Sequence, residues 1–303
     1  MTLLSMSPTS HRYTVASLTF ALTAPDSICV PKLLPSYAPF ASGDPTETPA
    51  FSIAVTTTGE HPSPEAGSRI INDTTNDLGH VTLWLTPGGH YLFHLFTAGT
   101  LHSMTADPQF SSPRISLTPG RDMSYALNSL VRIAFSQAIL TRGGISIHAS
   151  SVIDTNGCAY LFLGASGTGK STHSRLWIEN ISGITLLNDD NPIIRLIGDR
   201  PTVFGSPWSG KTPCYRSISA HIGGIARIER ATANAITPRT GPQAFIALLP
   251  SCSAIKASPL LFQSLCTTLS RLADTLPVAT LHCLPDSGAA LLCHKHFNTE
   301  CRI

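Results

Sequence analysis

Hydrophobic and polar residues alternate in short runs through the first part of the chain, and turn-forming residues separate these runs. The alternation and the β-branched and aromatic side chains predict strands rather than helices. Prolines and the Gly88-Gly89 pair mark turns, and the polar segment 58–79 is expected to be a long loop. The predicted strands cover 13–22, 51–57, 80–85, 90–97 and 114–117.

The period changes at 123–140, where apolar residues recur three and four positions apart and predict a helix. Beyond Gly143-Gly144, which end this helix, strand-like and helix-like segments alternate. We therefore expect a β-rich N-terminal region at 1–120 and an α/β domain at 121–303. The predicted strands of this domain are 145–153, 158–163, 184–187, 193–196, 202–204, 221–230 and 278–283, and its helices are 170–179, 241–256, 259–275 and 288–293.

The composition has few charged residues for its length. Of 303 residues, 42% are hydrophobic and 13% are charged, whereas charged residues usually make up roughly a quarter of a soluble domain. Either an unusually large surface is buried, within the chain or in a homo-oligomer, or the exposed surface is neutral. The many Ser, Thr and Pro residues favour a neutral surface, and both explanations stay open.

The charge and hydropathy patterns argue against two classes of partner. The formal net charge is +2, and no dense run of Lys and Arg indicates nucleic acid or an anionic membrane surface. No segment approaches the ~20 apolar residues of a membrane-spanning helix. The segment 13–24 could be the core of a signal peptide, but its alternation and thin basic flank favour a strand.

The eight cysteines contain no C-x-x-C pair, which favours a reduced, cytoplasmic protein over a disulfide scaffold. A zinc site would have to come from the C-terminal group Cys283, Cys293, His294, His296 and Cys301. Structural zinc sites usually include two ligands in a tight hook. That spacing is missing, so we do not expect zinc.

A glycine-rich motif follows the predicted strand 158–163. Residues 164–171 read Gly-Ala-Ser-Gly-Thr-Gly-Lys-Ser, which fits the phosphate-loop pattern G-x-x-x-x-G-K-[ST]. A strand before it and a helix after it are the context that the motif requires, so a chance glycine turn is the poorer explanation. The residues expected to bind the nucleotide are Gly164, Ala165, Ser166, Gly167, Thr168, Gly169, Lys170, Ser171 and Thr172.

Each part of this motif has a physical role. The glycines allow successive N–H groups to converge on one point, and the start of a helix adds partial positive charge. Lys170 would reach the β- and γ-phosphates, and the Ser171 hydroxyl would bind Mg²⁺. The sequence therefore predicts ATP and Mg²⁺ as cofactors.

Two carboxylates, Asp189 and Asp190, follow the predicted strand 184–187. Ligand-facing residues gather at the carboxyl ends of strands in a parallel sheet. One carboxylate would hold Mg²⁺, and the other would take the proton from an attacking hydroxyl. A turn before Pro192 without chemical function is the alternative, which the upstream phosphate loop disfavours.

The order of these motifs resembles a known family. Ile147-His148-Ala149-Ser150, the phosphate loop and Asn188-Asp189-Asp190 are together similar to the catalytic core of HPr kinase/phosphorylase and, more distantly, of ATP-dependent phosphoenolpyruvate carboxykinase. The resemblance covers about 143–297. It implies an α/β fold (α+β overall) with a P-loop core of this type and a mixed sheet, preceded by the β-rich region, and the family commonly forms oligomers.

The resemblance also implies roles for individual residues. His148 would contact the acidic pair or the reacting phosphate. Asp189 resembles the catalytic base and Asp190 a metal ligand together with Ser171, although the two aspartates could exchange roles. Without the resemblance, His148 on an apolar strand would be interpreted as a core residue.

The chain departs from the family pattern at 219–226. HPr kinases have a Glu-Val-Arg-Gly-Leu-Gly-Ile-type segment here, and this chain lacks its Glu and Arg. Neither phosphorolysis nor HPr as substrate therefore follows from the resemblance. Lys211 or Arg216 could instead supply positive charge to the transferring phosphoryl group, or either could be a solvated loop cation. Trp208 could stack on a ligand or belong to the core.

The preferred interpretation is a kinase that uses ATP and Mg²⁺ to phosphorylate a hydroxyl, on a protein or peptide serine or on a small molecule. One alternative is a nucleotide-sensing regulator without phosphotransfer. Another is a carboxykinase-like enzyme, which would need a second metal site and a carboxylate-binding arginine that the sequence does not assemble. The pattern does not identify the hydroxyl acceptor or distinguish ATP from GTP.

Overall fold

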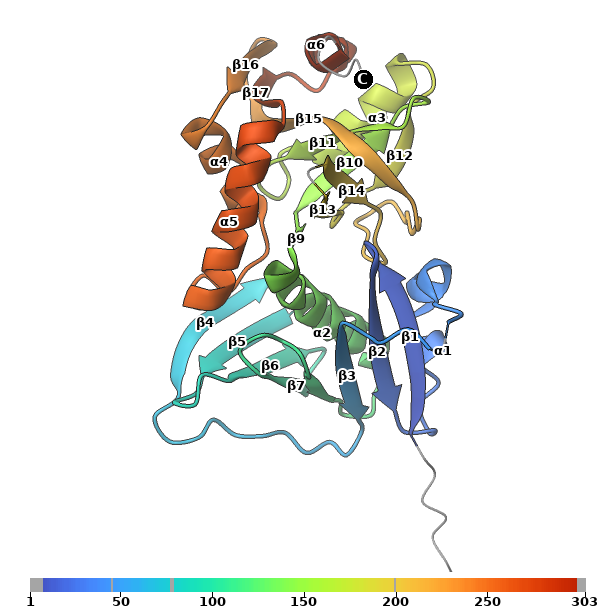
Figure 1. Ribbon diagram of the computed structural model, residues 1–303, viewed down its shortest axis with the longest axis vertical. Coiled ribbons are helices and arrows are strands. Elements are labelled where there is room, and N and C mark those ends of the chain that lie inside the picture. The colour runs from blue at the N-terminus through green and yellow to red at the C-terminus, as the bar shows by residue number, and fades with distance from the viewer. Residues whose placement is uncertain (1–7, 45, 77–78, 199, 299–303) are drawn as a thin grey trace, which may run out of the picture. The chain divides into compact units, whose positions relative to one another are not determined.

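The computed structural model describes residues 8–44, 46–76, 79–198 and 200–298. The chain divides into two compact units, one comprising 1–138 with 256–260 and the other 139–255 with 261–303 (Figure 1). The sequence-based boundary at 120/121 differs from this division because helix α2 (Met123–Ala138) belongs to the first unit. The fold is α/β with a mixed sheet in each unit.

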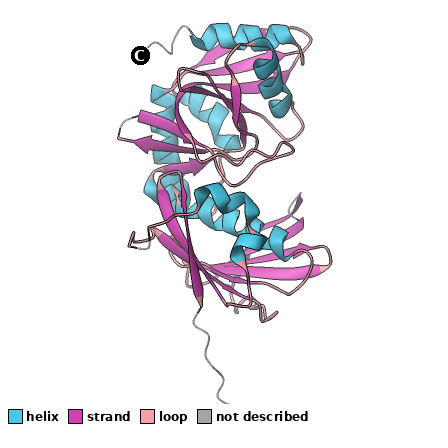
Figure 2. Cartoon of the chain, turned by 90° about the vertical axis from the view of Figure 1, so that its right-hand side faces the viewer, coloured by secondary structure: helices cyan, strands magenta, loops and turns pink. Residues whose placement is uncertain are grey.

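Aromatic packing explains why α2 belongs to the first unit. The ring of Phe135 on α2 lies 5.7 Å from that of Phe20 and 5.9 Å from that of Phe51, between centroids. All three side chains are buried, so they hold the helix against the sheet. Figure 2 shows the helices of this unit on one face of its strands.

The sheet of the first unit has eight strands. In spatial order the strands are β1 (Thr9–Val15), β2 (Leu18–Ala24), β3 (Phe51–Thr56), β8 (Arg114–Ser116), β7 (Thr100–Ala106), β6 (Tyr91–Thr97), β5 (Gly79–Leu85) and β4 (Arg69–Asn76). In sequence, α1 (Val30–Leu33) and η1 (Pro35–Phe40) lie between β2 and β3.

Two predictions for this unit are wrong. The segment 13–22 was expected to be one strand, but β1 and β2 form a hairpin that turns at Ala16 and Ser17, whose φ angles are 52° and 57°. Such a two-residue turn usually contains Gly or Asn, so nothing in the sequence marked it. The expected loop 58–79 contains β4, an edge strand that is mostly exposed on both faces and therefore lacks the alternation of a half-buried strand.

The second unit is built on a nine-stranded mixed sheet. Strands β11, β15 and β17 are parallel neighbours, and their other pairings are antiparallel. The main path of the sheet is β12 (Thr185–Asn188), β10 (Ala149–Ile153), β11 (Cys158–Leu163), β15 (Ser219–Arg230), β14 (Arg200–Phe204), β13 (Ile193–Ile197) and β9 (Gly144–Ser146); β17 (Val278–Cys283) pairs with β15, and β16 (Ala235–Arg239) pairs with β17. The helices are α3 (Lys170–Asn180), α4 (Pro242–Leu248), α5 (Pro259–Thr275) and α6 (Ser287–Asn298), with short turns η2 (Leu140–Arg142) and η3 (Leu249–Ser251).

The core of this unit is an aromatic cluster beneath α3 and α6. Trp177 of α3 lies 4.8 Å from Tyr160 and 5.2 Å from Phe162, both on β11, between ring centroids. Phe297 of α6 joins the same cluster. Because these side chains are fully buried, burial of large apolar surface fixes α3, and with it the loop that precedes α3.

In the part of the chain that the structure describes, no helix is both long and apolar enough to cross a membrane.

The free thiols among the described residues are Cys29, Cys214, Cys252, Cys266, Cys283 and Cys293. Cys158 is disulfide-bonded, so the expectation of a wholly reduced chain is not met at that position. Cys301, the last member of the zinc alternative, lies outside the described residues.

Candidate functional site

The phosphate loop, residues 164–172, runs from the end of β11 into the first turn of α3. Gly167 and Gly169 adopt φ angles of 77° and 113°, a backbone region that residues with side chains rarely occupy. Helix α3 begins at Lys170, and no side chain caps its start. The first N–H groups of a helix have no partner within the helix. This end of α3 is therefore suited to bind an anion.

The accessibility of the loop agrees with such a role. Ala165, Ser166 and Gly167 are exposed, and so is Ser171 in the first turn of α3, while Thr172 is half-buried. The exposed hydroxyl of Ser171 can contact a metal ion without rearrangement of the core.

Lys170 is nearly buried, at 8% exposure, and its side chain folds back over the loop. Its Nζ donates hydrogen bonds to the carbonyl oxygens of Gly164, at 3.1 Å, and Ala165, at 3.2 Å. Burial lowers the pKa of Lys170, and the carboxylates of Asp190 and Asp189 act in the opposite direction. The structure therefore brings the loop lysine within electrostatic range of both predicted acids.

The topology explains how the acids reach the loop. Strand β12 is antiparallel to β10, and β10 is antiparallel to β11. Strands β12 and β11 therefore point the same way and end at the same edge of the sheet. At that edge the Asn188 side chain accepts hydrogen bonds from the N–H groups of Asp190, at 3.0 Å, and Asn191, at 2.9 Å. This local turn changes the chain direction immediately after β12.

The carboxylate of Asp189 is buried and held from two sides. The Ser150 hydroxyl donates to its Oδ1 at 2.9 Å, and the backbone N–H of Thr212 donates to its Oδ2 at 3.2 Å. Each oxygen thus accepts one hydrogen bond, which fixes the orientation of the carboxyl group. A carboxylate oxygen can accept a second bond, so the group can still receive a proton from a substrate hydroxyl.

Asp190 faces His148. Its Oδ1 lies 3.0 Å from His148 Nδ1, and the two side chains are 19% and 40% exposed. Asn191 donates a hydrogen bond to the other carboxylate oxygen. Of the two acids, Asp190 is therefore the more accessible to solvent and to a metal ion.

His148 lies at an interruption that the sequence did not predict. The segment 145–153 was expected to be one strand, but β9 pairs with β13, whereas β10 pairs with β11 and β12. Between them, the N–H of His148 bonds to the Ser251 carbonyl at 2.7 Å. The change of partners releases His148 from a regular strand and leaves its side chain against Asp190.

A tight loop at 205–214 lies against the acids. At Gly210 an added Cβ would be 3.0 Å from the Asp189 carbonyl oxygen, so a side chain there would crowd the acid. Ser209 fixes the turn because its hydroxyl donates to the Thr212 carbonyl at 2.6 Å and accepts from Cys214 N–H at 3.1 Å. Lys211 is exposed on this loop, beside the residue that bonds Asp189.

The two other candidates from the sequence make contacts with backbone. The Arg216 guanidinium donates to the Leu186 carbonyl and contacts Thr185 Oγ1, so it is engaged with β12. Trp208 is buried, and its carbonyl accepts a hydrogen bond from the Asn188 side chain at 3.0 Å. The burial of Trp208 favours the core interpretation for its side chain.

Sequence reasoning missed Arg230. This residue ends β15, and its guanidinium donates a hydrogen bond to the Gly167 carbonyl of the phosphate loop. Strand β15 runs parallel to β11, with Leu163 opposite Arg227, so Arg230 extends past the point where the loop begins. A cation at the carboxyl end of the predicted strand 221–230 was a usable signal for a residue beside the phosphate loop.

Comparisons with protein families, curated proteins and solved structures gave different results. No protein-family model matches the chain, and no curated protein matches it. Among solved structures, the Hpr(Ser) kinase/phosphatase from Coxiella burnetii is similar over 51% of this chain and 94% of its own, with 11% sequence identity and a TM-score of 0.30.

Proposed function

We propose that this protein is a kinase that uses ATP and Mg²⁺ to transfer the γ-phosphoryl group to a hydroxyl, on a protein or peptide serine or on a small molecule. The observation that carries the proposal is a combination of groups at one sheet edge. The helix that follows the phosphate loop has no side-chain cap at its start. The loop lysine, Lys170, interacts electrostatically with the carboxylates of Asp190 and Asp189. This combination is what phosphoryl transfer requires.

The loop residues 164–172 would bind the phosphates through their N–H groups. Lys170 would exchange its bonds to the carbonyls of Gly164 and Ala165 for bonds to phosphate oxygens. The hydroxyl of Ser171 and the carboxylate of Asp190 are hard oxygen donors that fit Mg²⁺, which when bound offsets negative charge on the phosphates.

The remaining groups would act on the acceptor. Asp189 would take the proton of the acceptor hydroxyl while the hydroxyl oxygen of the acceptor bonds to the γ-phosphorus. The bond between the γ-phosphorus and the bridging β–γ oxygen breaks, which releases ADP. His148 would orient Asp190 and the acceptor, and Lys211 would add positive charge beside the transferring group. Ser150 would hold Asp189 in the orientation that this proton transfer needs.

The proposal is tested by measuring Mg·ATP binding and ADP formation across a panel of hydroxyl compounds and serine-containing peptides. Lys170→Ala should weaken Mg·ATP binding by roughly tenfold to a hundredfold, the range for loss of a charged hydrogen bond. Lys295→Ala, which removes an exposed lysine from α6, should leave binding unchanged. Wild-type affinity in Lys170→Ala would refute the loop assignment.

The same panel separates a kinase from a nucleotide-sensing regulator. A kinase forms ADP faster when one acceptor is present, and that acceptor gains a phosphoryl group detectable by mass spectrometry. A regulator binds Mg·ATP through Lys170 but forms no phosphorylated product with any acceptor in the panel.

A further inference from the structure

A pocket of about 410 Å³ opens beside the phosphate loop. One wall is formed by Gly167, Thr168 and the first turns of α3, including Leu176. The lining also includes residues at and after the carboxyl ends of β15 and β17, among them Arg230 and Leu284. Its volume lies within the roughly 300–1,000 Å³ that is typical of small-molecule sites.

We infer that this pocket binds the base and ribose of a purine nucleotide whose phosphates occupy the adjacent loop. The inference rests on the proposed function and extends it to the part of the nucleotide that the phosphate-loop motif does not specify. Four residues, Gly167, Thr168, Gly169 and Thr172, belong to both the loop and the pocket lining. A ligand bound through its phosphates at the loop therefore has the pocket directly beside it.

The walls suit the faces of an aromatic base. Leu176, Ile228 and Leu284 contribute apolar side chains. Leu284 is 39% exposed. A planar base between these side chains would cover apolar surface that is otherwise in contact with water.

Arg230 connects the pocket to the loop. It lines the pocket, and its guanidinium donates to the Gly167 carbonyl. A guanidinium is planar and stacks on aromatic rings, so the same side chain can contact the base while it fixes the loop backbone. The register supports this position, because Arg230 on β15 lies opposite Cys283 on β17, and both residues line the pocket.

The polar groups of the pocket provide little discrimination between purines. His173 lines the pocket, but it is buried, and its Nε2 already accepts a hydrogen bond from Trp177 Nε1 at 3.0 Å. Selection of guanine would call for an acceptor for its N–H groups, and no Asp or Glu occurs among the described lining residues. We therefore expect ATP and GTP to bind with similar affinity.

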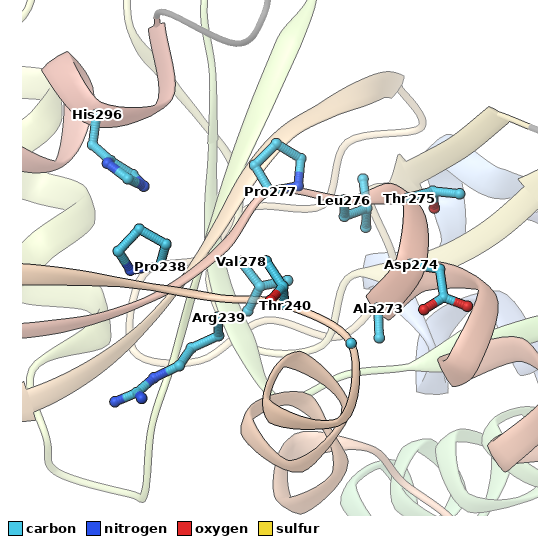
Figure 3. A pocket seen from close by; sticks show the side chains of 11 residues that line it. Pro238, Arg239, Thr240, Ala273, Asp274, Thr275, Leu276, Pro277, Val278 and His296 are labelled. Atoms are coloured by element: carbon cyan, nitrogen blue, oxygen red, sulfur yellow. The ribbon is translucent and has the colours of Figure 1, made fainter.

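A second pocket, of about 370 Å³, is too far from the phosphate loop to hold the base of the same nucleotide (Figure 3). It surrounds Val278 at the start of β17, and Arg239 and Asp274 lie on opposite sides of it in Figure 3. The first pocket adjoins Cys283 at the other end of the strand, roughly 17 Å away at 3.3 Å per residue. The second pocket contains no residue of the phosphate loop.

The experiment compares Mg·ATP, Mg·GTP and Mg·tripolyphosphate, which has no base, by calorimetric titration of the intact protein. In the wild type, both nucleotides should bind at least roughly tenfold more tightly than tripolyphosphate, since the base adds contacts that the polyphosphate lacks. Equal affinity for ATP and tripolyphosphate would overturn the inference while leaving the phosphate loop intact. Failure of all three to bind would overturn the proposed function, and the inference with it.

A pair of leucine variants locates the effect. Leu284→Asn should weaken ATP and GTP binding by roughly tenfold and leave tripolyphosphate binding unchanged, because an uncharged polar amide replaces apolar contact with the base. Leu291→Asn is the matched control, since Leu291 is 50% exposed on α6 and does not line the pocket. Unchanged nucleotide affinity in Leu284→Asn would contradict the assignment of the base to this pocket.

Discussion

The hydroxyl of Ser174 on α3 contacts the hydroxyl of Ser150 on β10, with 2.6 Å between the two oxygens. Because Ser150 has a single hydroxyl proton and donates it to Asp189, Ser174 is the donor in this contact. Both serines are buried. Ser174 lies one helical turn after Lys170, so the helix that presents the loop lysine also supports the proposed base.

Removal of this support should affect transfer more than binding. In Ser150→Ala, Asp189 loses the donor to its Oδ1, and we expect phosphoryl transfer to fall by about tenfold, the equivalent of one net hydrogen bond. Mg·ATP affinity should stay within about twofold of the wild type, because Ser150 does not touch the loop. Steady-state ADP formation and calorimetric titration measure the two quantities.

The neighbouring serine provides the control. Ser151 is also buried, but its hydroxyl donates to the Asn188 carbonyl at 3.1 Å rather than to an acid. Ser151→Ala should lower stability to a similar extent as Ser150→Ala while keeping turnover. Equal turnover in the two variants would exclude a positioning role for Ser150.

The two aspartates should differ in their dependence on Mg²⁺. If Asp189 is the base, Asp189→Asn keeps Mg·ATP binding and lowers transfer by roughly a hundredfold or more at any Mg²⁺ concentration. If Asp190 binds the metal, Asp190→Asn raises the Mg²⁺ concentration needed for half-maximal turnover, and excess Mg²⁺ restores part of the rate. Turnover measured against Mg²⁺ concentration tests both roles, and the reverse pattern would exchange the assignments.

Strands and helices with a clear hydrophobic pattern were predictable from the sequence. The strand 158–163 was predicted with the bounds of β11, and the helix 259–275 with those of α5. Both have clear hydrophobic patterns, and the strand is bounded by Gly157 and Gly164. The phosphate loop and the pair Asp189-Asp190 could be proposed from the sequence because adjacent residues in a local motif need no knowledge of the tertiary structure.

Features that depend on distant partners were not predictable. The interruption at His148 follows from β9 pairing with β13 while β10 pairs elsewhere. Strand β16 pairs with β17 across an exposed sheet edge, and its residues show little burial. The contact between Arg230 and the Gly167 carbonyl depends on the parallel pairing of β15 with β11. Local periodicity contains no information on which strands become neighbours.

The packing around Gly224 predicts that a single added methyl group lowers the stability of the protein. A Cβ on Gly224 of β15 would lie well inside van der Waals contact with the ring of Phe297, which is fully buried. Gly224→Ala should therefore lower the free energy of unfolding by about 1–3 kcal/mol, the usual cost of overpacking. Urea unfolding measures the change.

Two further variants test that explanation. Gly43→Ala should be close to neutral, because no atom lies within 4 Å of the added Cβ. Phe297→Leu in the Gly224→Ala background should recover part of the loss if the clash is its cause. An unchanged unfolding midpoint in Gly224→Ala would show that α6 can shift freely away from β15.

His173 predicts how the second unit responds to acid. It is buried between Phe162 and Trp177 and accepts a hydrogen bond from Trp177 Nε1, and burial lowers its pKa from 6.5 to about 4. Between these two pH values the unfolded chain binds a proton that the folded chain does not. The contribution of His173 to the free energy of unfolding is therefore fully present above pH 6.5 and is lost as the pH falls toward 4.

At pH 5 the loss should be roughly 2 kcal/mol relative to pH 7.5, since one pKa unit corresponds to about 1.4 kcal/mol. His173→Gln retains an acceptor for Trp177 Nε1 but does not titrate, so its unfolding free energy should fall less on acidification by about that amount. Urea unfolding of both proteins at the two pH values measures the difference. Equal falls would mean that His173 takes up its proton in the folded state as readily as in the unfolded chain, and that carboxylates elsewhere set the acid limit.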